Sequence, residues 1–137
     1  MKRIALLLLI IGLRALLPVL SYGQHQLEVE IINLRNDTGE VLLEVLNPDQ
    51  ELIIQKEGVI ENGNSTLFIE GLDEGVYAVR YFHDENSNKK LDTNVMGIPK
   101  EGYGFSNNAY SAFGPKGFEE WLFPVQSDTT ITLITTY

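Results

Sequence analysis

The chain has 137 residues, 44% of them hydrophobic and 21% charged, and its formal net charge is −9. This acidic balance argues against nucleic acid and anionic lipid surfaces as partners, because both repel a negatively charged protein. The chain contains no cysteine, which excludes disulfides and lipid attachment at a processed cysteine. The length suits one domain that is stabilised by apolar packing or by a bound ion.

The N-terminal segment predicts an export signal helix. Lys2 and Arg3 precede two apolar stretches that are separated by Arg14, and a small residue at position 23 suits cleavage. We therefore expect a signal peptide at 1–23 and a mature domain at 24–137, without a stable membrane anchor. An uncleaved span is the alternative, but a charge near the centre of a spanning helix costs about 2.5–3.5 kcal/mol.

Export would place the mature domain in the periplasm, on the outer surface or in the medium. Removal of the signal takes away three basic residues and no acidic one, which leaves 7 basic and 19 acidic side chains and a net charge of −12. Cations, including calcium, are attracted to such a surface.

The mature chain has the pattern of short strands. Residues 26–33 alternate between apolar and polar side chains, as a half-buried strand does. Further apolar or β-branched runs, separated by Gly, Asn, Asp and Pro, lie at 41–45, 52–54, 66–69, 76–82, 121–125 and 129–137. This spacing predicts an all-β fold, a single antiparallel β-sandwich of about seven strands. The run 76–82 is apolar enough on both sides that we expect both of its faces to be covered.

The segment 84–117 is too long for an ordinary connection. Its many aromatic and apolar residues argue against disorder. We expect one long ordered loop that folds back over the sandwich, with a single helical turn within 115–121.

Oxygen-bearing side chains follow a regular spacing at the start of this loop. Asp84, Asn86, Asn88 and Asp92 stand at relative positions one, three, five and nine, which allows a looped backbone to direct them toward one hard cation. With the backbone carbonyl of Lys90 they form a candidate calcium site. The alternative is that Asp and Asn stand here because they favour turns and bond their own backbone.

Aromatic residues near the glycines of the loop are candidates for ligand binding. Tyr103, Tyr110 and Trp121 are the members we expect to be exposed, where they would form a platform for a sugar or a partner protein. The alternative is that these rings belong to the core, because burying one ring stabilises a domain by roughly 1.5–3 kcal/mol.

A catalytic interpretation is weaker. His83 and Ser106 are a base and a nucleophile by type, but no Gly-x-Ser-x-Gly elbow surrounds Ser106. Adjacent His83 and Asp84 would also point to opposite faces of a continuing strand. We therefore expect structural roles for these residues and no enzymatic activity.

Two segments of the long loop carry a resemblance to a known family. The run His83 to Asp92 and the run Gly97 to Asn108, which reads Gly-Ile-Pro-Lys-Glu-Gly-Tyr-Gly-Phe-Ser-Asn-Asn, resemble the family of small exported bacterial proteins called domain of unknown function 2141. The resemblance extends over the whole mature chain. It implies an exported β-sandwich of immunoglobulin-like or transthyretin-like character, without an assigned activity.

The first of these segments is also similar to the calcium turns of bacterial surface adhesins and of helix-loop-helix proteins. It departs from both, since Lys89 stands where those turns have Gly, and Val95 stands where helix-loop-helix sites have Glu.

Together these observations predict an exported, non-enzymatic binding or structural module of the bacterial cell envelope. We expect a monomer whose partner is an envelope protein or a glycan, and calcium as the one possible cofactor. A carbohydrate- or peptide-binding accessory domain that uses the loop aromatics is the alternative, and a small hydrolase is a less favoured one.

Overall fold

The computed structural model describes residues 23–137, and all of its regular elements are strands or short 3-10 turns. The prediction of an all-β fold is therefore confirmed. The predicted signal helix lies outside the described residues. Within 23–137, no helix has the length and apolar character needed to cross a bilayer.

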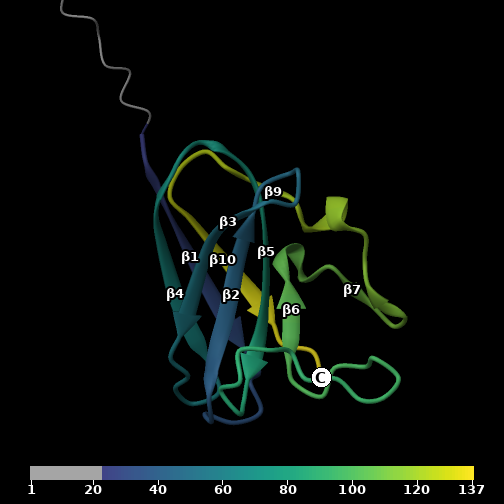
Figure 1. Cartoon of the computed structure of the whole chain (residues 1–137). Helices are drawn as coiled ribbons and strands as arrows, with labels where there is room; N and C mark the ends of the chain where they lie inside the picture. The colour runs from purple at the N-terminus through teal and green to yellow at the C-terminus, as the bar shows by residue number, and fades with distance from the viewer. Residues whose placement is uncertain (1–22) are drawn as a thin grey trace, which may run out of the picture.

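Two sheets form the body of the domain, and Figure 1 shows one lying behind the other. The first sheet has the order β10-β1-β4, and the second has the order β3-β2-β5-β6, with β9 also paired to β5. The bounds of these strands are β1 His25–Ile32, β2 Glu40–Leu46, β3 Leu52–Gly58, β4 Ser65–Leu72, β5 Gly75–Asp84, β6 Tyr103–Phe105, β9 Phe123–Val125 and β10 Thr129–Ile134.

The alternation predicted for the first strand is confirmed. Leu27, Val29 and Ile31 of β1 are fully buried, and the residues between them are partly exposed. They share one hydrophobic core with inward-facing residues of β4, β10, β2, β5 and β9. The core therefore lies between the two sheets, as the two-residue period of a half-buried strand requires.

One pairing differs from the antiparallel sandwich that the sequence predicts. β10 runs parallel to β1, with Leu27 opposite Thr129 and Ile31 opposite Leu133. A parallel pair needs a long crossover connection, and here nearly the whole domain separates the two strands. Short-range turn signals, which report hairpins, carry no information on such a pair.

The long segment predicted as a loop contains several short elements. After β6 it forms a 3-10 turn, η1 (Ser106–Asn108), a small hairpin of β7 (Tyr110–Ser111) and β8 (Gly114–Pro115), and a second 3-10 turn, η2 (Phe118–Trp121). η2 lies where the sequence predicts a helical turn, and Trp121 belongs to it rather than to the strand that follows. Because β6 joins the second sheet beside β5, the segment is ordered, as predicted.

The open side between edge strands β3 and β4 carries an inward-pointing charge. Lys56 lies on the inner face of β3, opposite Leu43 of β2, and its ammonium group donates to the carbonyl oxygen of Phe68 on β4. A charge in this position discourages the two edges from pairing with another chain.

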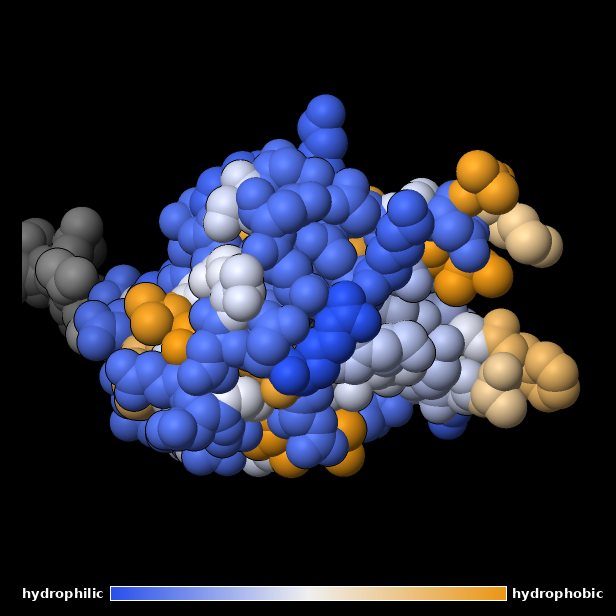
Figure 2. Space-filling model, turned by 90° about the horizontal axis from the view of Figure 1, so that it is seen from below, coloured by the Kyte–Doolittle hydropathy of each residue, from blue (hydrophilic) through white to orange (hydrophobic). Residues whose placement is uncertain are grey.

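Two loop tips carry the most exposed apolar side chains of the described chain. Val95 is 105% exposed and Met96 80%, while Phe113, between β7 and β8, is 103% exposed. Figure 2, seen from below, shows hydrophobic side chains gathered at two projections on the right of the molecule. These tips lie away from the core and offer a place for control substitutions.

Candidate ligand-binding groove

The sequence suggests that both faces of the run 76–82 are covered, and the structure bears this out only in part. On the outer face of the second sheet Leu42, Leu46 and Ala78 are buried, but the face stays open around Arg80 and Phe82. Arg80 is exposed and Phe82 partly exposed on β5, while their neighbours Val79 and Tyr81 point into the core. Successive strand residues point to opposite faces, so one side of β5 builds the core and the other side is available to a ligand.

Strand register places outward-facing side chains in two rows across this sheet. Gln55 pairs with Glu44, which pairs with Arg80, which pairs with Phe105. In the next row Leu42 pairs with Phe82, and Phe82 pairs with Tyr103. The first row is polar toward β3 and aromatic toward β6. The second row is apolar except at its β3 end, where Glu57 pairs with Leu42.

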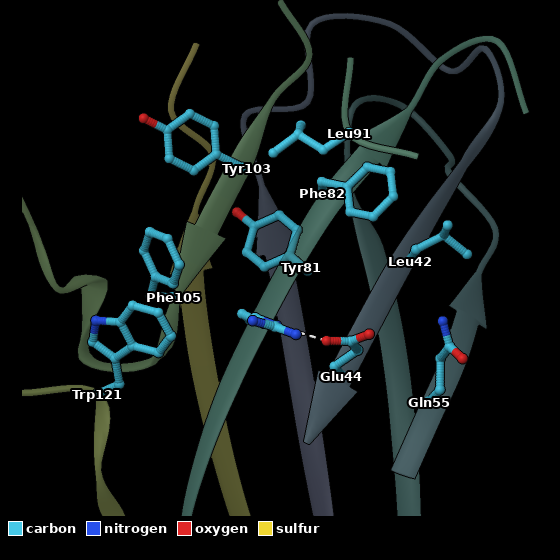
Figure 3. A pocket seen from close by; sticks show the side chains of 10 residues that line it. Leu42, Glu44, Gln55, Tyr81, Phe82, Leu91, Tyr103, Phe105 and Trp121 are labelled. Atoms are coloured by element: carbon cyan, nitrogen blue, oxygen red, sulfur yellow. Dashed lines mark hydrogen bonds and ion pairs between the residues drawn. The ribbon is translucent and has the colours of Figure 1, made fainter. Parts of the chain in front are cut away.

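These rows form the floor of a cavity of about 310 Å³, which we call the aromatic groove. In Figure 3, Phe105 and Trp121 lie together on one side and Gln55 on the other, with Glu44 between them. The volume lies at the lower end of the range for small-molecule sites. The residues that line the groove are Leu42, Glu44, Gln55, Arg80, Tyr81, Phe82, Leu91, Tyr103, Phe105 and Trp121.

Two charged residues of the described chain line the groove, and they are paired with each other. Arg80 Nε donates a hydrogen bond to Glu44 Oε2 over 2.6 Å, and the two side chains are 51% and 25% exposed. An exposed pair of this kind adds little stability. It nevertheless makes the floor of the groove nearly neutral while keeping hydrogen-bonding groups on it.

The aromatic wall of the groove is built from contacts between rings. Phe105 and Trp121 stack with centroids 4.2 Å apart and planes inclined by 25°. Tyr103 contacts Phe105 edge to face at 5.9 Å, and the indole N–H of Trp121 donates to the Lys116 carbonyl oxygen over 3.1 Å. Such arrangements fix ring orientation in addition to burying area, so the wall is shaped before any ligand arrives.

Two polar residues after β6 hold this wall in place. Ser106 Oγ, fully buried, accepts from Val79 N at 2.9 Å and donates to the Trp121 carbonyl oxygen at 2.5 Å. Asn107 donates its side-chain amide to the carbonyl oxygens of Glu120 and Leu122, at 3.0 and 2.9 Å. Together the two residues attach η2, and with it Trp121, to β5.

Asn108 instead forms hydrogen bonds with the backbone at the free edge of β10. Its Oδ1 accepts from Ile134 N at 2.8 Å, and its Nδ2 donates to the Thr132 carbonyl oxygen at 3.2 Å. The side chain thus imitates a neighbouring strand. Asn107 and Asn108 both have positive φ, 59° and 47°, a conformation that Asn adopts more readily than most residues.

The three predicted ligand-binding aromatics are only partly brought together. Tyr103 and Trp121 line the groove, whereas Tyr110 lies next to Tyr103 without lining it, its hydroxyl 2.9 Å from the Tyr103 hydroxyl. Burial, followed by this hydrogen bond, raises the pKa of Tyr103. Tyr103 is only 8% exposed, so Trp121 is the more accessible ring.

The sequence interpretation did not find the other half of the groove. Arg80, Glu44, Phe82 and Phe105 were not singled out as site residues, although alternation places Arg80 and Phe82 on one face of their strand. The missing information was that this face remains open, which depends on strands that are distant in sequence.

The predicted calcium loop folds around the carboxylate of Asp84, which is fully buried. Its Oδ1 accepts from Asn88 N at 3.1 Å and its Oδ2 from Lys89 N at 2.7 Å. Asp92 accepts from the side-chain amides of Asn86, at 2.6 Å, and of Asn88, at 3.0 and 3.1 Å. Four of the five predicted ligand residues therefore lie together, and their contacts are those of a capped turn.

The fifth predicted ligand residue, Lys90, donates its backbone N–H to Asn88 Oδ1 at 2.9 Å. Glu101, only 4% exposed, closes the loop by accepting from Glu85 N at 2.9 Å and from Asp92 N at 3.0 Å. Within residues 23–137, no three Asp, Glu or His side chains are placed to share a metal ion. The observed contacts are those of a turn and do not test calcium binding, which stays a prediction.

Lys89 stands at a turn position that favours Gly, and its side chain provides contacts that Gly could not. Its φ is 63°, a left-handed conformation that favours Gly, yet its ammonium group contacts Glu40 on β2 and lies 2.9 Å from Glu57 Oε1 on β3. The hydrogen bonds with Glu40 and then Glu57 raise the pKa of Lys89, and the hydrogen bond from Lys89 lowers the pKa of Glu57. The loop is thereby anchored to the sheet that carries the groove.

The candidate catalytic residues do not converge. His83 is fully buried, its Nε2 lies 2.7 Å from the Thr38 carbonyl oxygen and its Nδ1 lies 3.0 Å from the Tyr137 hydroxyl. Because a carbonyl oxygen only accepts, Nε2 carries a proton and donates it to Thr38. Ser106 is engaged with Val79 and Trp121 instead, so the arrangement that the hydrolase alternative requires is not formed.

Comparisons with known proteins identify one family. The family model described as uncharacterized protein conserved in bacteria, domain of unknown function 2141, matches residues 29–132. This range runs from β1 to β10 and includes the groove and the Asp84 loop. No curated protein and no solved structure matches the chain.

Proposed function

Since the chain belongs to this uncharacterized bacterial family, we propose that it is an exported, non-enzymatic binding module of the cell envelope that holds a ligand in the aromatic groove. One observation supports binding over a purely structural role. Aromatic side chains stand on an open sheet face, held there by buried polar contacts, although burial in the core would stabilise the domain more.

We propose with this the finer description of the fold. The two sheets, their common core and the late strand that returns to the first sheet suit a single sandwich of immunoglobulin-like or transthyretin-like type. The N-terminal residues 1–23 would be a cleaved signal, and the mature domain would act as a monomer whose partner is an envelope protein or a glycan.

Calcium is a second part of the proposal. Bound at Asp84, Asn86, Asn88, Asp92 and the Lys90 carbonyl oxygen, the ion would stiffen the loop from which Leu91 reaches into the groove. Each carboxylate oxygen of Asp84 accepts one N–H group and retains a second lone pair for a cation.

Site-specific photocrosslinking in the producing bacterium tests the groove as a binding surface. A photoreactive phenylalanine analogue replaces Gln55, which is exposed in the groove, and in a control it replaces Thr130, which is exposed on the outer face of the other sheet. We expect a discrete adduct from position 55, reduced by a second substitution, Phe105→Ala, and none from position 130. Equal labelling at both positions, or no adduct at either, would contradict the proposal.

A further inference from the structure

We infer that the ligand of the aromatic groove is a neutral glycan chain rather than a peptide or an acidic molecule. This inference rests on the proposed function, because it assumes that the groove is the binding surface. Three features of the groove carry it: its cancelled charge, its mixture of ring faces with polar side chains, and the pairing of its wall strand β6 on both sides.

The paired charges on the floor of the groove disfavour charged ligands. Arg80 and Glu44 are 2.6 Å apart, and among residues 23–137 they alone bring charge to the lining. A carboxylate or phosphate that approached Arg80 would also meet the carboxylate of Glu44, and a cation that approached Glu44 would meet the guanidinium group. Like charges brought together in this way repel each other, so a neutral ligand is favoured.

The polar groups of the floor suit hydroxyl groups. Arg80 uses its Nε–H on Glu44 and has four further N–H donors, while Glu44 offers further lone pairs and Gln55 supplies both an amide donor and a carbonyl acceptor. A sugar hydroxyl donates and accepts at once, so neighbouring hydroxyls of one ring satisfy such a mixed row. A hydrocarbon ligand would leave these groups without partners, which is costly.

The aromatic wall supplies the complementary apolar contact. The face of an aromatic ring carries negative electrostatic potential, and the C–H groups on the face of a pyranose are weakly positive. Trp121 is held against Phe105 and fixed by its N–H bond to Lys116. A sugar ring that lies against this wall turns its hydroxyl edge toward Arg80 and Gln55, which stand in the same row as Phe105.

A peptide that binds by adding a strand to a free sheet edge finds no such edge at the wall of the groove. The wall strand β6 is already occupied on both sides. It pairs with β5 through Tyr103, Gly104 and Phe105, and on its other side Tyr103 N and O exchange 2.9 Å hydrogen bonds with Thr136 O and N. The groove presents a sheet face of side chains, which is what a glycan requires.

The single tryptophan of the chain reports on this site directly. The purified protein is titrated with neutral hexasaccharides of gluco-, manno-, xylo- and N-acetylglucosamine type, with an acidic hexagalacturonate and with a soluble mixed-sequence decapeptide pool, while Trp121 fluorescence is recorded. We expect saturable quenching by at least one neutral hexasaccharide. Hexagalacturonate and the peptides should bind at least about tenfold more weakly, corresponding to about 1.4 kcal/mol.

Two groove variants and one control separate ligand contact from folding. Phe105→Ala and Gln55→Ala should each weaken binding of the neutral hexasaccharide, by about tenfold for the ring. Phe113→Ala removes a fully exposed ring outside the groove and should change nothing. Because Gln55 is exposed, its variant should melt like the unmodified protein even if Phe105→Ala is destabilised.

The outcomes distinguish this inference from the function on which it rests. Binding only by hexagalacturonate or only by peptides, weakened by Gln55→Ala, would overturn the glycan inference and leave the groove as a binding surface. Quenching that none of the groove variants changes would overturn both. No quenching by any neutral hexasaccharide at millimolar concentration would overturn the glycan inference. The photocrosslinking experiment would then still test whether the groove binds any ligand.

Discussion

The buried carboxylate of Asp84 should contribute strongly to stability even without a metal ion. It is fully buried and accepts two backbone N–H groups, from Asn88 at 3.1 Å and Lys89 at 2.7 Å. A hydrogen bond to a charged group contributes about 1.5–3 kcal/mol. Asp84→Ala removes both bonds, and we expect a loss of about 3 kcal/mol after water reaches the freed N–H groups. For a domain of this size that loss lowers the melting temperature by about 10 °C.

The assay is thermal and urea unfolding, followed by circular dichroism in the presence of chelator. Asp49→Ala is the matched control, because Asp49 is exposed and its removal changes the net charge by the same amount. A surface substitution of this kind usually changes stability by less than about 0.5 kcal/mol. An Asp84→Ala protein that unfolds within 1 kcal/mol of the unmodified protein, about the error of such comparisons, would refute the cap as the reason for the loop's order.

The same two proteins test calcium binding. An ion that binds only the native state stabilises it by about 2.7 kcal/mol when its concentration is 100 times the dissociation constant. If the Asp84 loop binds calcium, 10 mM calcium should raise the melting temperature of the unmodified protein and of Asp49→Ala, but not that of Asp84→Ala. If calcium does not shift the melting temperature of the unmodified protein, the calcium proposal is rejected. The stabilising role of the Asp84 hydrogen bonds would be unaffected by that result.

Three further predictions concern the groove wall, the core and the turn before β2. Ser106→Ala leaves the buried Val79 N–H without a partner and should cost about 1–3 kcal/mol in urea unfolding; a loss under 0.5 kcal/mol would show that the wall does not depend on this contact. Burial raises the pKa of Tyr81, so the folded state keeps a proton that the unfolded state loses above about pH 10. Stability should therefore be complete below pH 10 and fall by up to about 1.4 kcal/mol per pH unit above it, with a smaller slope in Tyr81→Phe; an equal slope would contradict this origin. Gly39→Ala should cost about 3 kcal/mol or more, because φ is +75° and a Cβ atom would lie 1.9 Å from the Asp84 carbonyl oxygen; unchanged thermal melting would disprove that packing.

Much of the fold could be predicted from local pattern. Alternation in β1 correctly indicates which side chains enter the core, and the Asp and Asn residues after β5 correctly indicate an ordered turn. Such signals are local because strand period and turn chemistry involve only a few neighbouring residues. The parallel pairing of β1 with β10 could not be predicted in this way, since it depends on how the chain returns after a hundred residues.

The groove escaped prediction for a related reason. An outward face that carries Phe82 beside Arg80 is compatible with a covering element or with an open surface, and the sequence of β5 is the same in both cases. Only the placement of β6 and η2 at the side of the sheet, instead of across it, leaves the face open. The rings of the wall, Tyr103 and Trp121, could be predicted because they lie in or beside the long segment that stands out by its length and its aromatic content.

The run Tyr103-Gly104-Phe105 shows how the core and the groove depend on each other. Tyr103 and Phe105 face outward and form the wall, so Gly104 between them faces inward. A Cβ atom on Gly104 would lie 2.7 Å from the Tyr81 ring, whose hydroxyl is 3.0 Å from Thr135 Oγ1. The glycine therefore lets a buried tyrosine pass beneath the wall strand. A side chain at position 104 would push β6 away from β5 and displace the wall. The run Tyr-Gly-Phe therefore has two functions: its glycine allows packing on the inner face, and its two rings provide the proposed binding surface on the outer face.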